Sequence, residues 1–361
     1  VYGRYNFKGT WWSPASTHLA FLRIDESAVD TLVVVDHLPQ TLDVEELKYP
    51  KAGQGNPVAT LWVARAEDGA KVPVDLSKYA GQEILINRVG WRPDGSEVLL
   101  MVQDREQTWL DLDVADPETG KLRTLFREKS RAWVNVLAMP RWLEDGSFLW
   151  ESERTGYKHL YHYDAQGKLL GAVTSGEWQV RNILRLDEKR RFMIFTATKD
   201  GAVNDNAYIV DLDGKNLRRL TRDPGMHRIS LNGDATLFLD NLSSLDKPGE
   251  QRLARVSDGE ILKIIATATP PRACEIYGYS TPELVSIPAR DGYPLDATII
   301  KPHGFEAATA YPVWIETYSG PDAPSVRNRW NGSPWAQFLA QRGYIFFQVN
   351  VRTASGRGQC H

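Results

Sequence analysis

Asp25 and Glu26 form a pair of adjacent carboxylates near the start of the sequence. A pair of carboxylates can hold an ammonium group or a metal ion. However, Asp25 closes an apolar run that begins at Leu19 and has the pattern of a strand, and neighbouring residues of a strand point to opposite faces. We therefore expect Asp25 and Glu26 to be solvated or paired with arginine instead of forming one site.

The histidines and cysteines do not have the spacing of a metal site. None of the seven histidines has a partner four residues away on a predicted helix, or a cysteine at zinc-binding spacing. His159 and His162 are three residues apart, but on a strand their side chains would face opposite ways. No glycine-rich loop leads from a strand into a helix. We therefore predict no metal ion and no cofactor.

No serine lies in the Gly-x-Ser-x-Gly pattern that places a nucleophile on a sharp turn between a strand and a helix. Ser175, Ser319 and Ser355 each have one adjacent glycine, but they lack the flanking pair. The 361 residues therefore contain no recognisable serine nucleophile.

The composition is that of a folded protein with a near-neutral net charge. Of the 361 residues, 42% are hydrophobic, and the formal net charge is −3. Neither a basic stripe nor an uncharged apolar stretch of about 18 residues is present, so we expect no nucleic-acid partner and no membrane span. Two cysteines, Cys274 and Cys360, cannot form a disulfide framework.

Short strands are the elements that must position any site up to about residue 270. Runs such as Val98–Met101 and Arg191–Phe195 have no 3.6-residue period, which indicates strands. Turns that contain glycine recur along this part of the chain, and a second series of turns alternates with them. Each repeating unit should therefore contain two hairpins, and so four strands. Because one such sheet cannot bury both faces alone, we predict about five units stacked as propeller blades, with a large β-sandwich as the alternative. The glycine turns are spaced by about 51, 47, 47 and 45 residues, at Gly69, Gly120, Gly167, Gly214 and Gly259.

The stretch from Pro39 to Pro57 interrupts this rhythm with several turn-forming residues. We expect a long loop inserted in the first unit. Long loops on a rigid scaffold are often functional, although a simple surface excursion is equally consistent with the sequence.

After Pro270-Pro271 the pattern changes to that of an α/β domain. Strands are predicted on either side of the turn at Asp291-Gly292 and again over residues 313–318. A helix is predicted from Ser333 to Arg342, with Pro334 in its first turn and Gly343 at its end, before an apolar strand over residues 344–350. The succession of strand, helix and strand predicts a partly parallel sheet.

Several long motifs occur in a fixed order along the chain. Together they resemble the propeller of dipeptidyl peptidase IV and its bacterial relatives, and the resemblance covers nearly the whole sequence. It implies an eight-bladed β-propeller followed by an α/β-hydrolase domain, in a serine exopeptidase that removes dipeptides with Pro or Ala at the second position. The motifs include Trp11-Trp12-Ser13-Pro14, Tyr49-Pro50-Lys51-Ala52-Gly53, Arg154-Thr155-Gly156-Tyr157-Lys158-His159-Leu160-Tyr161 and Tyr318-Ser319-Gly320-Pro321.

The resemblance also implies which parts of such an enzyme precede and follow this chain. The paired glutamates that hold the substrate amine precede the segment matching Val1-Tyr2-Gly3-Arg4, and the Ser-Asp-His triad lies beyond the position matching His361. We therefore expect a mainly β chain in which residues 1–270 form a partial propeller missing its first blades. Residues 271–361 would be the truncated start of the peptidase domain, and the chain alone would be inactive.

Tyr318 is the catalytic residue that the resemblance implies within the chain. It would help to form the oxyanion hole of the intact enzyme, because a phenolic donor can stabilise charge that develops only in the transition state. The alternative is an aromatic side chain that covers the core at the end of a strand. Trp133 and Asn135 lie where the family places a loop facing the substrate, although Trp133 could instead fill a core between blades.

Arg352 is the last candidate for substrate binding. It matches an arginine that the family flanks with glycines, which are replaced here by Val351 and Thr353, so the loop cannot adopt positive φ as cheaply. The alternative is that Arg352 and Arg357 pair with carboxylates outside this chain.

The resemblance also implies that the intact protein acts on peptide substrates and forms a homodimer. It further implies a periplasmic or secreted location. A second class of function stays open, because some relatives have lost their serine. In that case the chain would belong to a non-catalytic β-propeller that binds peptides or proteins.

Overall fold

The computed structural model describes residues 8–320, 323–354 and 356–358. Val1–Arg4 and Cys360–His361, on which some of the sequence expectations depend, lie outside the described residues. The chain divides into two compact units, Val1–Phe148 with Tyr163–Lys168, and Leu149–His162 with Leu169–His361. The two α-helices among the described residues span only five and eight residues, and neither is long enough to cross a bilayer.

Two four-stranded antiparallel sheets in the first unit share one hydrophobic core. Ala20 and Leu61 of one sheet pack in the same cluster as Val98 and Leu100 of the other. Every residue of β8 is buried, since neighbouring elements cover both of its faces. The strand orders are β1(Thr10–Trp12)-β2(His18–Asp25)-β5(Val58–Arg65)-β6(Lys71–Pro73) and β10(Leu122–Lys129)-β9(Trp109–Ala115)-β8(Val98–Asp104)-β7(Ile84–Trp91), with a 3-10 turn at Ser77–Tyr79 between the sheets.

A buried polar network lies beside this core. The Tyr79 hydroxyl is 2.7 Å from Asp111 Oδ2 and 2.5 Å from Asp113 Oδ2, and both carboxylates are almost fully buried. Burial alone would raise the pKa of Asp111, but hydrogen bonds from Arg127 and Tyr79 outweigh it and hold that pKa below its usual value. Lys78 Nζ adds a bond of 2.7 Å to Asp113, so the buried charges are paired.

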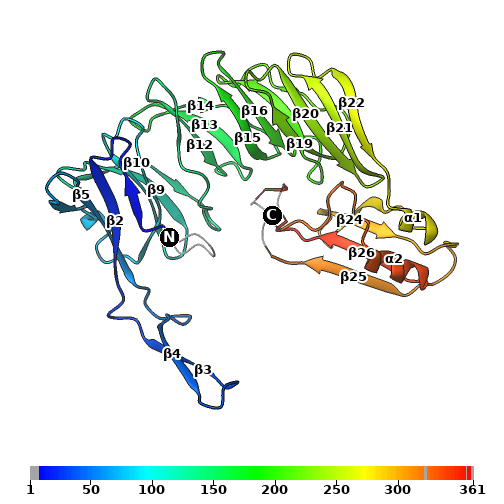
Figure 1. Cartoon of the computed structure of the whole chain (residues 1–361), viewed down its shortest axis with the longest axis horizontal. Coiled ribbons are helices and arrows are strands. Elements are labelled where there is room, and N and C mark those ends of the chain that lie inside the picture. Colours follow the sequence, from blue (N-terminus) through cyan, green and yellow to red (C-terminus); the bar gives the residue numbers. More distant parts are fainter. Residues whose placement is uncertain (1–7, 321–322, 355, 359–361) are drawn as a thin grey trace. The chain divides into compact units, whose positions relative to one another are not determined.

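The segment around Pro39–Pro57 belongs to an insertion between β2 and β5, as predicted, but it contains the strand β4 and is part of a hairpin arm, so the expectation of a loop is wrong. Strands β3 (Thr31–Asp36) and β4 (Asp43–Lys48) pair along their whole length into an antiparallel hairpin that leaves the sheet of β2 and β5 (Figure 1). All residues of β4 are exposed, so no buried face imposes an alternation of polar and apolar residues that the sequence could reveal.

Three further four-stranded sheets follow in chain order, which agrees with the five predicted units. The division between the two compact units passes through the first of them. The other two lie side by side in the second unit and share a core that includes Ile194 and Phe238 (Figure 1). The strands are β11(Arg141–Trp142), β12(Phe148–Ser152), β13(His159–Tyr163) and β14(Leu169–Ala172); β15(Val180–Asp187), β16(Phe192–Ala197), β17(Asn206–Asp211) and β18(Arg218–Arg219); and β19(Met226–Leu231), β20(Leu237–Ser244), β21(Lys247–Arg255) and β22(Ile261–Ala268).

The recurring glycine turns are places where one sheet approaches the next. Gly120, Gly167, Gly214 and Gly259 all have positive φ, and a Cβ on any of them would lie within 3.0 Å of a carbonyl oxygen of the preceding sheet or of residues adjoining it. At Gly259 that oxygen belongs to Leu220, 2.3 Å from where a Cβ would be. The sequence repeat therefore marks both a turn conformation and a close backbone contact between sheets.

The last sheet mixes antiparallel and parallel pairing as predicted. β23 (Glu283–Pro288) and β24 (Pro294–Ile300) form a hairpin, and β26 (Ile345–Asn350) lies between β24 and β25 (Val313–Tyr318). β25 and β26 are parallel and are joined through α2 (Pro334–Gln341), whose N-cap Ser333 accepts a hydrogen bond from Ala336 N. A short helix, α1 (Arg272–Ile276), connects β22 to this sheet.

Candidate active site

Tyr318 lies at the carboxyl end of β25, with 61% of its area exposed. In the parallel pairing of β25 with β26 it stands directly opposite Asn350. A Cβ on Gly320 would lie 2.4 Å from Cε1 of the Tyr318 ring, so only glycine at position 320 allows the ring to take this place. The glycine of the Tyr-x-Gly motif is thus explained by packing, because it leaves room for the tyrosine ring at an exposed strand end.

The segment that follows Tyr318 is tied to the same end of the sheet. Asn350 is buried, and its side chain accepts a hydrogen bond from Val326 N at 2.8 Å and donates one to Val326 O at 2.9 Å. Because the carboxyl ends of parallel strands share one edge, Tyr318 and the residues just after Asn350 meet there. Ligands of sheets with parallel strands commonly bind at such an edge.

Arg352 follows Asn350 and is already engaged within the chain. Its Nη2 donates to both carboxylate oxygens of Asp291, at 2.6 and 2.7 Å, and its guanidinium lies 4.4 Å from the centre of the Tyr293 ring. The bond from Arg352 is also the main reason that the pKa of Asp291 is below its ordinary value. The guanidinium would have to leave this carboxylate, or share it, to reach a substrate.

The arginines of this loop do not need carboxylates from outside the chain, and that alternative is wrong. Arg357 forms bonds of 2.9 and 2.5 Å to Asp296, as Arg352 does to Asp291. The positive φ values of the loop occur at Gly356 and Gly358, and neither Val351 nor Thr353 has one. The positions of this loop that need positive φ are therefore occupied by glycines further along the chain.

Trp133 and Asn135 lie in the first unit, between β10 and β11. The Trp133 Nε1 donates to Asn135 Oδ1 at 3.2 Å, so the structure brings these two side chains together. Between these two residues Val134 is buried; its N donates to Gln107 O at 2.7 Å, and its O accepts from Gln103 Nε2 at 2.6 Å. Trp133 is 37% exposed, so Val134 and not the tryptophan takes the core position.

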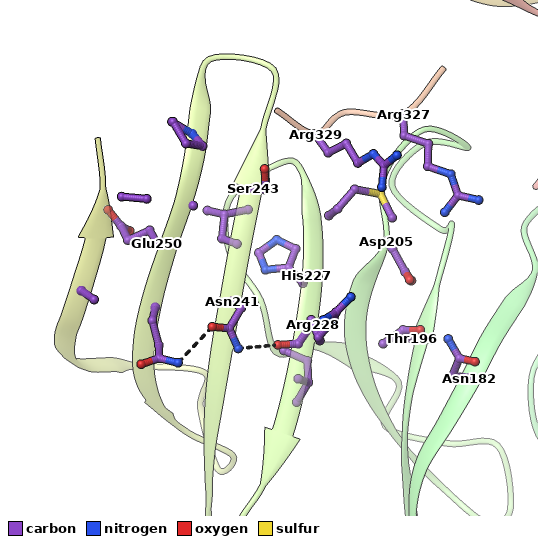
Figure 2. A pocket seen from close by; sticks show the side chains of 18 of the residues that line it. Asn182, Thr196, Asp205, His227, Arg228, Asn241, Ser243, Glu250, Arg327 and Arg329 are labelled. Atoms are coloured by element: carbon purple, nitrogen blue, oxygen red, sulfur yellow. Dashed lines mark hydrogen bonds between the residues drawn. The ribbon is translucent and has the colours of Figure 1, made fainter. Parts of the chain in front are cut away.

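A pocket of about 780 Å³ in the second unit was not anticipated from the sequence. It lies between the sheets β15–β18 and β19–β22, and Arg327 and Arg329 line it from the segment that follows Tyr318 (Figure 2). Asp205 and Thr196 belong to its wall. No short motif could have revealed it, because Asp205 and Arg327, on its two sides, are more than a hundred positions apart in the sequence.

Burial raises the pKa of Asp205, in this pocket, to about 6. The Thr196 hydroxyl and the positive charges of Arg181, His227 and Arg327 act in the opposite direction without cancelling the effect. In the part of the chain that the structure describes, no group of three or more His, Cys, Asp or Glu residues could hold a metal ion.

Comparisons with known proteins identify the family of this chain and several of its relatives. Residues 5–249 match the family described as dipeptidyl peptidase IV N-terminal region. Human dipeptidyl peptidase 8 is 25% identical over 435 residues, which cover 98% of this chain, and the Aspergillus fumigatus protein named Probable dipeptidyl peptidase 4 is 25% identical over 375 residues, which cover 97%. The chain spans 48% of the length of both relatives.

A solved structure has the same fold. The crystal structure of Porphyromonas gingivalis dipeptidyl peptidase 4 superposes with a TM-score of 0.84 at 24% identity, over 98% of this chain and 50% of that one. At this level of identity the likeness concerns the fold, which is mainly β and similar to the N-terminal region of that enzyme.

Proposed function

Because the chain belongs to the dipeptidyl peptidase IV N-terminal region family, we propose that it is part of a serine peptidase that releases dipeptides from free peptide N-termini. Pro or Ala would be preferred at the second position. Residues 1–270 would form the β-propeller, of eight blades in the intact protein, and would limit access to short N-terminal segments. Residues 271–361 would begin the α/β-hydrolase domain.

The position of Tyr318 is the observation that carries this proposal. It is an exposed phenol at the carboxyl end of a parallel strand, in a position that the absence of a side chain at Gly320 leaves free. A hydroxyl at such an edge can donate to the oxygen of a scissile carbonyl as that oxygen becomes negative. Trp133, Asn135 and Arg352 would contact substrate, Arg352 only by sharing or leaving Asp291.

The 361-residue chain itself would not hydrolyse peptides, because none of its serines lies in a Gly-x-Ser-x-Gly turn. The test compares this chain with one extended to the length of its relatives, using a Gly-Pro chromogenic substrate. We expect turnover only by the extended chain, and Tyr318→Phe should lower its kcat by about 100-fold or more, the usual effect of losing one oxyanion donor.

Three outcomes would decide against parts of the proposal. Turnover by the 361-residue chain would contradict its inactivity, and an unchanged kcat in Tyr318→Phe would remove the oxyanion role. An extended chain that binds peptides without cleaving them would favour the alternative, a non-catalytic propeller that binds peptides or proteins.

A further inference from the structure

The pocket between the sheets β15–β18 and β19–β22 has cationic groups held over one side. Asn328 fixes the segment that carries them: its N donates to Val203 O at 2.9 Å, and its Oδ1 accepts from Leu245 N at 3.1 Å. The residues before and after it, Arg327 and Arg329, both line the pocket (Figure 2). One anchored asparagine thus presents two guanidinium groups to the same space.

These guanidinium groups form no ion pair at salt-bridge distance within the described part of the chain. Among the described residues, the only side-chain hydrogen bond of Arg327 is a long contact of 3.5 Å from its Nε to Pro324 O, and Arg329 has no ion pair. Arg228, on β19, also lines the pocket and has no ion pair within the described part of the chain. The pocket therefore has positive charge that no carboxylate of the described residues pairs with.

The wall of the pocket contains a buried hydrogen-bond acceptor without a donor. Oδ1 of Asp205 is buried and has no hydrogen-bond partner in the described residues, and the buried hydroxyl of Thr196 lies close enough to favour the ionised carboxylate. The backbone of Asp205 is fixed, because its N donates to Gly225 O and its O accepts from His227 N, each at 3.0 Å. Leaving a buried acceptor without a donor is unfavourable, so a donor supplied by a ligand would be favoured here.

The other charges of the wall are already neutralised. His227 is buried, and its Nδ1 lies 2.8 Å from Asp240 Oδ1 while its Nε2 bonds Asp223 O at 2.9 Å. Glu250 accepts a hydrogen bond from Arg252. The groups left for a ligand are consequently one carboxylate with a neighbouring hydroxyl, and the arginines.

This combination of groups favours a ligand that carries both a positive and a negative charge. A simple anion would satisfy the arginines but would approach the carboxylate of Asp205, whereas a simple cation would meet Arg327 and Arg329. A molecule with an ammonium at one end and a carboxylate at the other complements both, and the volume is within the usual range of small-molecule sites, about 300–1,000 Å³.

We propose that this pocket binds a short zwitterionic peptide, with its carboxylate on Arg327 and Arg329 and its ammonium on Asp205 and Thr196. Arginine suits the carboxylate because its fork of N–H donors can bind both oxygens. A free dipeptide has this chemistry. The site follows from the contacts above and does not depend on peptidase activity.

The test is calorimetric titration of the 361-residue chain at low salt with three probes. Gly-Pro has both charges, N-acetyl-Gly-Pro lacks the ammonium, and Gly-Pro amide lacks the carboxylate. We expect saturable binding of Gly-Pro and at least tenfold weaker binding of each capped probe. Arg329→Gln and Asp205→Asn should each weaken Gly-Pro binding at least tenfold.

Arg290→Gln is the matched control, since Arg290 is also exposed in the second unit but does not line the pocket. It should bind Gly-Pro as the unaltered chain does, and circular dichroism should show that all three variants are folded. Absence of Gly-Pro binding would overturn the proposal. Equal binding of either capped probe would also overturn it, as would an unchanged affinity in Asp205→Asn. None of these results bears on peptide hydrolysis by the extended chain.

Discussion

Replacement of Asp205 by asparagine should stabilise the protein at neutral pH. Burial raises the pKa of this carboxyl from 3.8 to about 6. At 1.36 kcal/mol for each pKa unit, this difference corresponds to about 3 kcal/mol against the ionised form in the folded state. Asparagine has nearly the same shape and no charge, so Asp205→Asn should remove this penalty.

The sign of the effect depends on pH. Because the folded pKa lies above the unfolded value, the penalty is absent below about pH 3.8, grows as the pH rises, and is complete above about pH 6. The free energy of unfolding of Asp205→Asn should therefore exceed that of the unaltered chain by up to about 3 kcal/mol at pH 8 and by almost nothing at pH 3.5.

Urea denaturation followed by tryptophan fluorescence at both pH values measures this difference. Asp258→Asn serves as the control, because Asp258 is exposed and its pKa is lowered, chiefly by a hydrogen bond from Glu260 N. That variant should not be stabilised at pH 8. A lower stability of Asp205→Asn than of the unaltered chain at pH 8, or an equal gain at both pH values, would contradict a buried charge at Asp205.

Two other predictions concern stability. Gly259→Ala should be destabilised by about 1–2 kcal/mol for its positive φ and by about 1–3 kcal/mol more for the contact with Leu220 O. Gly69 has a similar φ but nothing within 4 Å, so Gly69→Ala should lose only the stability that the positive φ costs. Thermal denaturation measures both losses, and equal losses would contradict a close contact at Gly259. Tyr79→Phe should cost about 1–3 kcal/mol in urea denaturation, because it removes the donor shared by two buried carboxylates, and an unchanged midpoint would show that other donors suffice.

The local elements of the fold could be predicted because their signals are local. The positive φ of Gly120 and its neighbours in the series, the N-cap of α2 and the strands on either side of it are each written within a few consecutive residues. The spacing of the turns was then enough to predict five four-stranded sheets. The hairpin of β3 and β4 escaped prediction because none of its strand residues is buried, and only a buried face imposes a hydrophobic period.

The amino-acid sequence was sufficient to predict most of the strands, their grouping, the family resemblance and the candidate tyrosine. Only the tertiary structure decided that Val134 and not Trp133 is buried, that Arg352 has a partner in Asp291, and that Asp205 lies in one pocket with Arg327. The physical reason is that burial and charge pairing are sums over neighbours in space, and residues 205 and 327 become neighbours only when the segment after β25 folds back onto the sheets.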